Sequence, residues 1–156
     1  MKKILIILTT FSLVGCSSLE TLNSKLDESI AKTSVKDTSV PQFKREVISF
    51  APYSADLSKT YFEELKSFAW QFKSTYYYKP EHKILLKGYI DSLEKEKGFS
   101  NLGRQRANMI KDFLITQGVD SSKILVYDLG GKEYLYSNET IIGKAKNRSV
   151  KIEIVK

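Results

Sequence analysis

Two side chains of opposite charge, Asp91 and Arg106, are the strongest candidates for binding chemistry in this sequence. Asp91 closes a short apolar run, and Arg106 follows fifteen residues later in the first turns of a predicted helix. Because strand ends and helix starts meet at one rim of a layered sheet, we expect both side chains to face one small pocket. An arginine fork beside the free N–H groups of a helix start suits a carboxylate, and an aspartate suits an ammonium. The pattern predicts a site for a zwitterionic ligand.

The alternative is that Asp91 and Arg106 pair with each other as a structural ion pair. Such a pair at the surface contributes about 1 kcal/mol or less to stability. Taken on these residues alone, the ion pair is the favoured interpretation. The two interpretations make different predictions for ligand binding. Substitution of Asp91 or Arg106 should weaken binding only if the two residues form a ligand site.

No catalytic or metal-binding set accompanies this pair of residues. His82 is the single histidine, and no cysteine or acid pattern surrounds it, so we expect a surface residue. The sequence lacks the motifs of serine nucleophiles, glycine-rich phosphate loops and zinc proteases. We therefore predict that the protein is not an enzyme and uses neither a metal nor a cofactor.

The elements that must position Asp91 and Arg106 alternate between strands and helices. Strands are expected at 45–51, 82–90, 123–129 and 148–155, helices at 57–72 and 102–117, and a short helical turn at 139–146. Gly118 ends the second helix, since glycine adopts the left-handed conformation readily. This order predicts an α+β fold, a βαβαβ(α)β sandwich in which helices cover one mixed sheet.

Aromatic residues gather around the first of these helices, including Trp70 and the run Tyr76–Tyr78. They could form a stacking platform for a ligand, or they could pack in the core and at its rim. Because most of them follow the helical period, packing is the favoured interpretation.

The first 43 residues differ in composition from the rest of the chain. Residues 1–15 combine two lysines, an apolar run and small residues, which is typical of a secretory signal and too short to span a bilayer. The sequence Leu-Val-Gly-Cys that ends at Cys16 resembles the lipobox at which bacterial lipoproteins are cleaved and acylated on the cysteine. The alternative is an ordinary signal that leaves one free thiol.

Residues 16–43 are rich in Ser, Thr, Lys and Asp, which predicts a flexible linker. Leucines at nearly helical spacing within it leave a short coiled coil as the alternative. The folded domain is then expected to cover residues 44–156.

The charge distribution argues against a nucleic-acid partner. The whole chain carries 25 basic and 18 acidic residues, a formal net charge of +7. Removal of residues 1–15 takes away Lys2 and Lys3 and leaves 23 − 18 = +5, without a run of five or more like charges. The expected partner is a membrane, because several acyl chains on Cys16 would hold the protein firmly there.

Four ordered motifs resemble the OmpA-like peptidoglycan-binding domain family, and within it the peptidoglycan-associated lipoproteins (Pal). The motifs are Gly88–Asp91, Leu102–Ala107, Gln117–Ile124, and the spaced set of Asn138, Thr140, Gly143, Asn147 and Arg148. The resemblance covers residues 44–156. It implies the α+β sandwich of the OmpA C-terminal domain.

The chain also departs from the family pattern near the charged pair. Phe99 stands where the family has an asparagine eight residues after the aspartate, and Ile90 replaces a threonine or alanine. Gln105 and Ser149 stand where the family doubles its arginines. These changes keep the charge pair and remove hydrogen-bonding groups, so we expect weaker binding to the wall.

The resemblance implies roles for the candidate site residues. Asp91 would hold the amine, and Arg106 the carboxylate, of the diaminopimelate side chain in peptidoglycan stem peptides. Backbone donors near Leu102 and Gly103 would complete the site.

The resemblance further implies an outer-membrane lipoprotein of a Gram-negative cell, with its domain facing the periplasm and tethering the membrane to the wall. Ser17 after Cys16 is, by resemblance to lipoproteins generally, typical of the outer membrane. The alternative is a structural part of a secretion, conjugation or flagellar machine. Tol-like or secretion-system envelope proteins would then be its partners.

Overall fold

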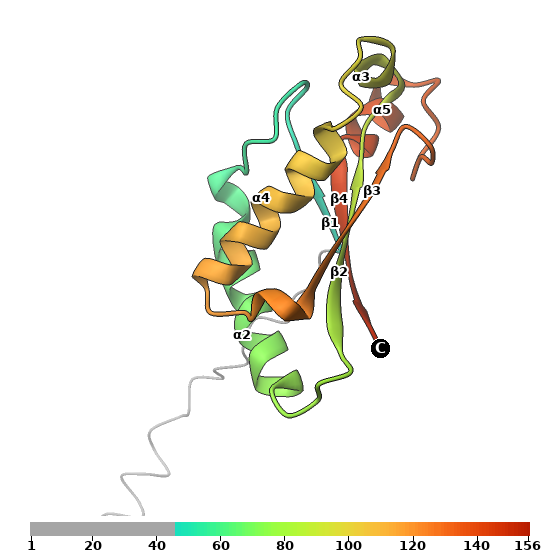
Figure 1. The fold of residues 1–156 in the computed structure, drawn as a ribbon. Coiled ribbons are helices and arrows are strands. Elements are labelled where there is room, and N and C mark those ends of the chain that lie inside the picture. Colours follow the sequence, from blue (N-terminus) through green and yellow to red (C-terminus); the bar gives the residue numbers. More distant parts are fainter. Residues whose placement is uncertain (1–45) are drawn as a thin grey trace, which may run out of the picture. The chain divides into compact units, whose positions relative to one another are not determined.

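The computed structural model describes residues 46–156 of the chain (Figure 1). These residues belong to the second of two units, Met1–Thr38 and Ser39–Lys156. The expected signal, the acylated Cys16 and the linker up to residue 43 lie outside the described residues and stay predictions. Between residues 46 and 156, no helix is long and apolar enough to cross a membrane.

Four strands of the described region form one mixed sheet with the order β1–β4–β2–β3. The strands are β1 (Val47–Ser49), β2 (Lys83–Tyr89), β3 (Ile124–Gly130) and β4 (Ser149–Val155). Strand β4 pairs antiparallel with β1 and β2, whereas β2 and β3 run parallel. The predicted mixed sheet is confirmed.

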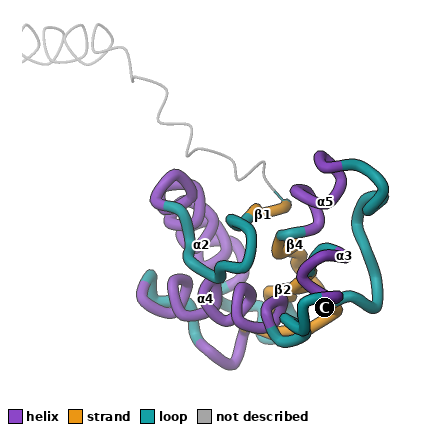
Figure 2. The backbone as a smooth tube through the Cα atoms, turned by 90° about the horizontal axis from the view of Figure 1, so that it is seen from above, coloured by secondary structure: helices purple, strands orange, loops and turns teal. Residues whose placement is uncertain are grey.

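Two long helices cover one face of this sheet, and two short helices lie at its end. They are α2 (Phe62–Tyr76), α3 (Ser92–Glu96), α4 (Leu102–Thr116) and α5 (Ile141–Asn147), with two 3-10 turns, η1 (Lys59–Tyr61) and η2 (Ser121–Lys123). Figures 1 and 2 place α2 and α4 along the same side of the strands, whereas α3 and α5 lie at the end of the sheet. The sequence predicts only a polar segment where α3 forms.

The core lies between α2, α4 and the sheet, where the predicted periodicities meet. Strand β2 buries alternate side chains, and both long helices bury a stripe at helical spacing. The buried residues of these three elements include Ile84 and Leu86 of β2, Leu65, Phe68, Ala69 and Phe72 of α2, and Leu102, Ala107, Ile110 and Leu114 of α4. The stripe predicted for α4 is confirmed, and Arg106 is buried beside it.

Local signals set the ends of the long helices. The Ser58 hydroxyl accepts a hydrogen bond from the Thr60 N–H at the start of η1, which leads directly into α2. Gly118 follows α4 with a φ of 81°, as its position after the apolar stripe predicts.

The packing interpretation holds for the aromatic residues at helical spacing, because Phe68 and Phe72 are buried and Tyr61 and Tyr76 pack against the core. It is wrong for three other aromatic residues of the cluster. Trp70, Tyr77 and Tyr78 are 52%, 72% and 90% exposed. Trp70 lies outside the buried stripe of α2, and the helix ends at Tyr76, so the next two side chains leave its apolar face. Tyr76 stacks on His82 with 4.7 Å between ring centroids, and His82 is therefore half-buried instead of a surface residue.

Candidate ligand site at the end of the sheet

Asp91 and Arg106 lie at the same end of the sheet, where β2 ends and α4 begins. Both residues are buried, with exposed fractions of 1% for Asp91 and 0% for Arg106. In the described region, no hydrogen bond or ion pair joins the two side chains. The alternative of a direct surface ion pair between them is therefore wrong, because each side chain has a different buried partner.

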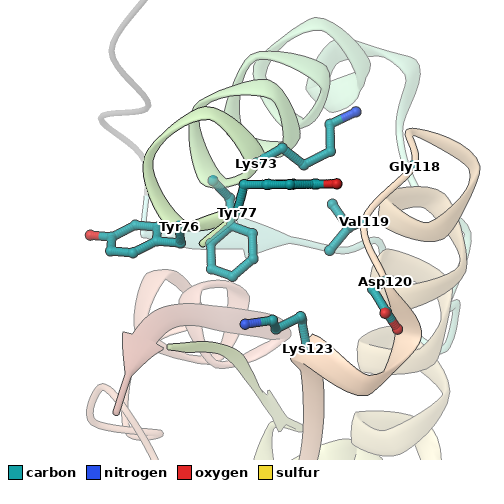
Figure 3. Close-up of a pocket in the computed structure, with 8 residues that line it drawn as sticks. Lys73, Tyr76, Tyr77, Gly118, Val119, Asp120 and Lys123 are labelled. Carbon is teal, nitrogen blue, oxygen red and sulfur yellow. The ribbon is translucent and has the colours of Figure 1, made fainter. Parts of the chain in front are cut away.

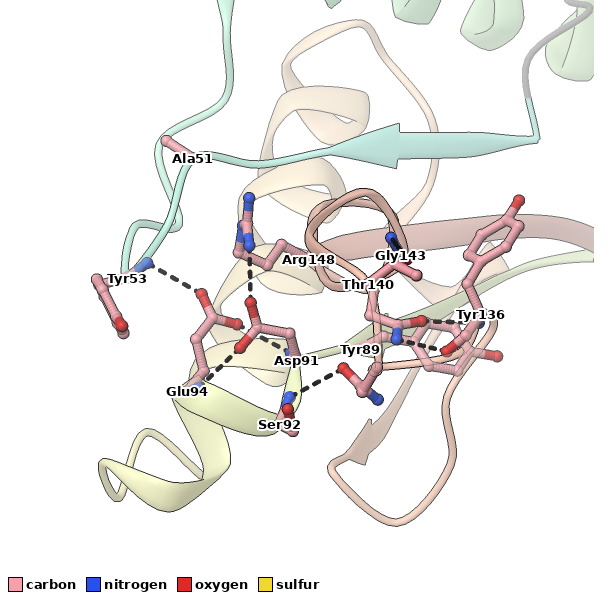
Figure 4. A network of polar contacts seen from close by, with 12 residues as sticks. Ala51, Tyr53, Tyr89, Asp91, Ser92, Glu94, Tyr136, Thr140, Gly143 and Arg148 are labelled. Carbon is pink, nitrogen blue, oxygen red and sulfur yellow. Dashed lines mark hydrogen bonds and ion pairs between the residues drawn. The ribbon is translucent and has the colours of Figure 1, made fainter.

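The Asp91 carboxylate caps α3 and pairs with an arginine from the end of the chain. Its Oδ1 accepts a hydrogen bond from the Glu94 N–H at 2.8 Å, and its Oδ2 accepts one from Arg148 Nη1 at 2.7 Å (Figure 4). Arg148 directly precedes β4, whose pairing with β2 brings it to Asp91. One oxygen of the Asp91 carboxylate therefore caps α3, and the other pairs with the charged side chain of Arg148.

The Arg106 guanidinium uses all five of its N–H donors. Two of them form a bidentate pair with Glu94, at 2.9 Å to Oε2 and 2.6 Å to Oε1. The other three donate to backbone carbonyls, those of Ser54 at 2.9 Å, Ala51 at 3.2 Å and Tyr89 at 3.2 Å. Arg106 therefore joins α4, the end of β2, α3 and the loop after β1.

Glu94 is a central residue of this candidate site that the sequence analysis does not predict. Its carboxylate is 1% exposed and accepts four hydrogen bonds, two from Arg106 and two from the N–H groups of Tyr53 at 2.9 Å and Asp91 at 3.3 Å. Asp91 and Glu94 form a capping box, and their spacing of three residues is the signal that could have located Glu94. That spacing indicates a helix start and contains no information about Arg106.

The loop that follows β1 closes the site from one side. Tyr53 has a φ of 57°, which is uncommon for a residue with a side chain. Its ring lies 5.3 Å from that of Phe99, and Lys97 Nζ lies 4.7 Å from the centre of the Tyr53 ring. Phe99, which replaces an expected asparagine, therefore takes part in an aromatic contact beside Glu94.

Leu102 and Gly103 contribute through the position of α4. The Leu102 N–H donates to the Phe99 carbonyl at 3.0 Å, and the backbone donors beside the fork are instead those of Tyr53 and Asp91. A Cβ on Gly88 would lie 2.0 Å from the Gly103 carbonyl oxygen. This close approach of two glycines brings α4 near enough to β2 for Arg106 to reach the Tyr89 carbonyl.

The fourth sequence motif surrounds the same site. Asn138 Oδ1 accepts from the Ser92 N–H at 3.1 Å, and Thr140 caps α5 by accepting from the Gly143 N–H at 2.9 Å. The Asn147 side chain bonds both the N–H and the carbonyl of Tyr136 (Figure 4). These contacts hold the loop before α5 against α3 and place Arg148 next to Asp91.

Tyr89, the last residue of β2, is buried at this end of the sheet. Burial raises the pKa of the Tyr89 phenol above its ordinary value. In the described part of the chain, no cluster of three or more His, Cys, Asp or Glu side chains could hold a metal ion. The buried ion pairs of Arg106 with Glu94 and of Arg148 with Asp91 make the site suited to charged and hydrogen-bonding groups.

The described part of the chain has one pocket beside the site and another far from it. One, of about 190 Å³, lies beside α3 and is lined by Ile90, Lys95, Asp128 and Lys132 among others. The second, of about 170 Å³, lies at the other end of the sheet, between the end of α2 and the segment from Gly118 to Lys123 (Figure 3). It contains none of the predicted site residues.

Comparison with known proteins identifies the family to which this chain belongs. The chain matches the OmpA family over residues 49–148, and it belongs to that family. It is 40% identical over 75 residues to the "Probable lipoprotein YiaD" of Escherichia coli, across 48% of this chain and 34% of that protein. It is 32% identical over 107 residues to the "Peptidoglycan-binding protein ArfA" of Mycobacterium tuberculosis, across 69% of this chain and 32% of that protein. The matched segment is thus about a third of each relative.

A third relative is matched over more of its length. The chain is 30% identical over 121 residues to a "Type IV secretion system putative outer membrane lipoprotein" of Brucella suis, across 78% of this chain and 63% of that protein.

Solved structures share the fold. The peptidoglycan-associated lipoprotein of Burkholderia pseudomallei superposes with a TM-score of 0.64 at 22% identity, over 71% of this chain and 91% of that one. The C-terminal domain of Helicobacter pylori MotB also gives a TM-score of 0.64, at 18% identity, over 72% and 85% of the two chains. These similarities confirm the OmpA-like α+β architecture.

Proposed function

We propose that this chain is a non-catalytic, lipid-anchored envelope protein whose domain binds peptidoglycan through Asp91 and Arg106. The single observation that carries the proposal is the placement of these two buried, oppositely charged residues in one network at the end of the sheet. Membership of the OmpA family and similarity to a peptidoglycan-binding protein support it. Acylation at Cys16 and the linker to residue 43 would then let the domain tether the outer membrane to the wall from the periplasmic side.

The ligand that fits this chemistry is the zwitterionic end of a diaminopimelate side chain. Asp91 takes its ammonium, and the fork of Arg106 takes its carboxylate. Leu102 and Gly103 act indirectly, because the start of α4 and its contact with Gly88 fix the position of Arg106. The partner is therefore a stem peptide of the wall, and neither a metal nor a cofactor has a role.

Binding to purified sacculi tests this proposal with the variant Asp91→Asn. Asparagine also caps helices well, so the change keeps the α3 cap and removes the charge. We expect about a thirtyfold loss of affinity, corresponding to roughly 2 kcal/mol for an unpaired ligand charge in a buried site. Walls whose stems carry lysine in place of diaminopimelate should also bind more weakly, because lysine lacks the second carboxylate.

Asp120→Asn is the matched control. Asp120 also caps a short helix, accepting from the Ser122 N–H at 2.8 Å, but it lies in the exposed segment before β3 at the other end of the sheet. It should bind sacculi as the native chain does. Equal binding by Asp91→Asn and Asp120→Asn would refute the proposed site.

A second candidate function is a structural part of an envelope machine. The similarity to the secretion-system lipoprotein of Brucella suis favours it, since that match covers most of both chains. Crosslinking in cells separates the two functions. A machine component should crosslink to the same protein partners before and after Asp91→Asn, and a wall-binding protein should lose contact with the sacculus.

A further inference from the structure

The fork of Arg106 already holds a carboxylate, that of Glu94. The two carboxylate oxygens accept four hydrogen bonds, from Arg106 Nη1 and Nη2 and from the N–H groups of Tyr53 and Asp91. An arginine fork with two backbone N–H groups is the same type of donor set that the proposed function requires for a ligand carboxylate. Glu94 thus occupies the place of a ligand group.

No donor of Arg106 remains for a second carboxylate. Its other three N–H groups donate to the carbonyls of Ala51, Ser54 and Tyr89. A ligand carboxylate cannot add to this arrangement, and it can bind the fork only if the Glu94 carboxylate leaves.

We propose that Glu94 is an internal competitor for the Arg106 fork and sets the affinity of this chain for carboxylate ligands. The inference rests on the proposed function and deepens it. The native chain binds a stem peptide only in the fraction of molecules in which Glu94 has left the fork. The apparent dissociation constant is then the intrinsic constant divided by that fraction.

The surroundings of Glu94 allow such a departure. Glu94 lies on α3, a helix of five residues, and the neighbouring side chains of Leu93, Phe99 and Tyr53 are 39%, 41% and 40% exposed. Gly98 follows this helix with a φ of 84°, and nothing lies within 4 Å of the position that a Cβ would take there. The segment that carries Glu94 therefore has little core packing of its own to lose.

The loop from Ala51 to Ser54 closes the filled fork. It donates the Tyr53 N–H to Glu94 and offers the carbonyls of Ala51 and Ser54 to Arg106. Tyr53 has its uncommon positive φ within this loop, and such a conformation is stable only where surrounding contacts hold it in place. Departure of Glu94 removes one of those three bonds, so we expect the loop to loosen with it.

Thermal unfolding of the full chain carrying Glu94→Ala tests the inference. Removal of one partner of a buried ion pair should lower the melting temperature by about 10 °C or more. Addition of meso-diaminopimelate should return much of this loss, on the order of 10 °C at a hundredfold excess over the dissociation constant. The diamine cadaverine, which has no carboxylate, should not. The native chain should respond much less to diaminopimelate, because its fork is filled.

Two further variants keep the test decisive. Glu96→Ala, on the exposed side of the same helix, is the matched control and should behave as the native chain does in both measurements. Glu94→Gln keeps the side-chain volume and removes the charge, so it retains more of the fold and should show a smaller ligand response of the same sign. This variant decides the question if Glu94→Ala does not fold.

Sacculus binding by the same proteins separates failure of the inference from failure of the proposed function. We expect Glu94→Gln to bind sacculi at least about tenfold more tightly than the native chain, because the internal competitor is weakened. If native and variant chains bind equally and diaminopimelate stabilises them equally, the proposed function stands and the competitor role is refuted. If no variant binds sacculi, the proposed function fails. The competitor role then stands only if diaminopimelate still stabilises the Glu94 variants more than the native chain.

Discussion

The substitution Arg106→Lys tests the central role assigned to the arginine. Arg106 donates five hydrogen bonds, two to the Glu94 carboxylate and three to backbone carbonyls. Lysine keeps the positive charge but has three donors, so at least two buried acceptors lose their partner. Each buried acceptor left unpaired costs about 1–3 kcal/mol. The expected loss in the free energy of unfolding is therefore about 2–6 kcal/mol.

Urea unfolding followed by circular dichroism measures this loss directly. Thermal unfolding should show a fall in melting temperature of about 10 °C or more, since 1 kcal/mol corresponds to roughly 4 °C for a domain of this size. The matched control is Arg104→Lys, because the Arg104 side chain is 65% exposed and its Nε lies 3.8 Å from Asp128 Oδ2. That control should change stability by less than about 0.5 kcal/mol.

A specific result would refute this reasoning. If Arg106→Lys changes the free energy of unfolding by less than about 1 kcal/mol, then the five hydrogen bonds are not what holds α3, α4 and the loop after β1 together. The charge alone would then account for the role of Arg106 in the fold.

Two other predictions concern the helix contact and the anchor. Gly103→Ala should destabilise the domain by about 1–3 kcal/mol, because the new Cβ would lie 2.8 Å from Asp128 Oδ1 and 2.9 Å from the Gly88 carbonyl oxygen. The control is Gly98→Ala, where nothing lies within 4 Å of the new Cβ and only the positive φ opposes the change, so it should destabilise the domain by about 1 kcal/mol. If thermal melts show that Gly103→Ala destabilises the domain no more than Gly98→Ala does, the steric argument is wrong. Cys16→Ala should abolish incorporation of labelled palmitate and remove the protein from the outer-membrane fraction, whereas unchanged labelling would exclude acylation at this cysteine.

Much of the fold could be predicted from the sequence because its signals are local. The alternation of buried residues in β2, the apolar stripe of α4 and the left-handed Gly118 each depend on residues within a few positions of one another. The placement of Asp91 and Arg106 at one end of the sheet could also be predicted from the sequence, because one residue lies at a strand end and the other near a helix start. Local patterns could not reveal the exposed Tyr77 and Tyr78, because the point at which α2 ends depends on the chain that follows it.

The partners of the charged residues were decided by the tertiary structure alone. Asp91 meets Arg148, which lies 57 residues away, only because β4 pairs with β2. The capping-box spacing of Asp91 and Glu94 is visible in the sequence, but several other carboxylates are also close to Arg106 along the chain. Residue types show that an arginine fork will bind a carboxylate. The path of the backbone, through α3 and the loop from Ala51 to Ser54, decides that the carboxylate belongs to Glu94.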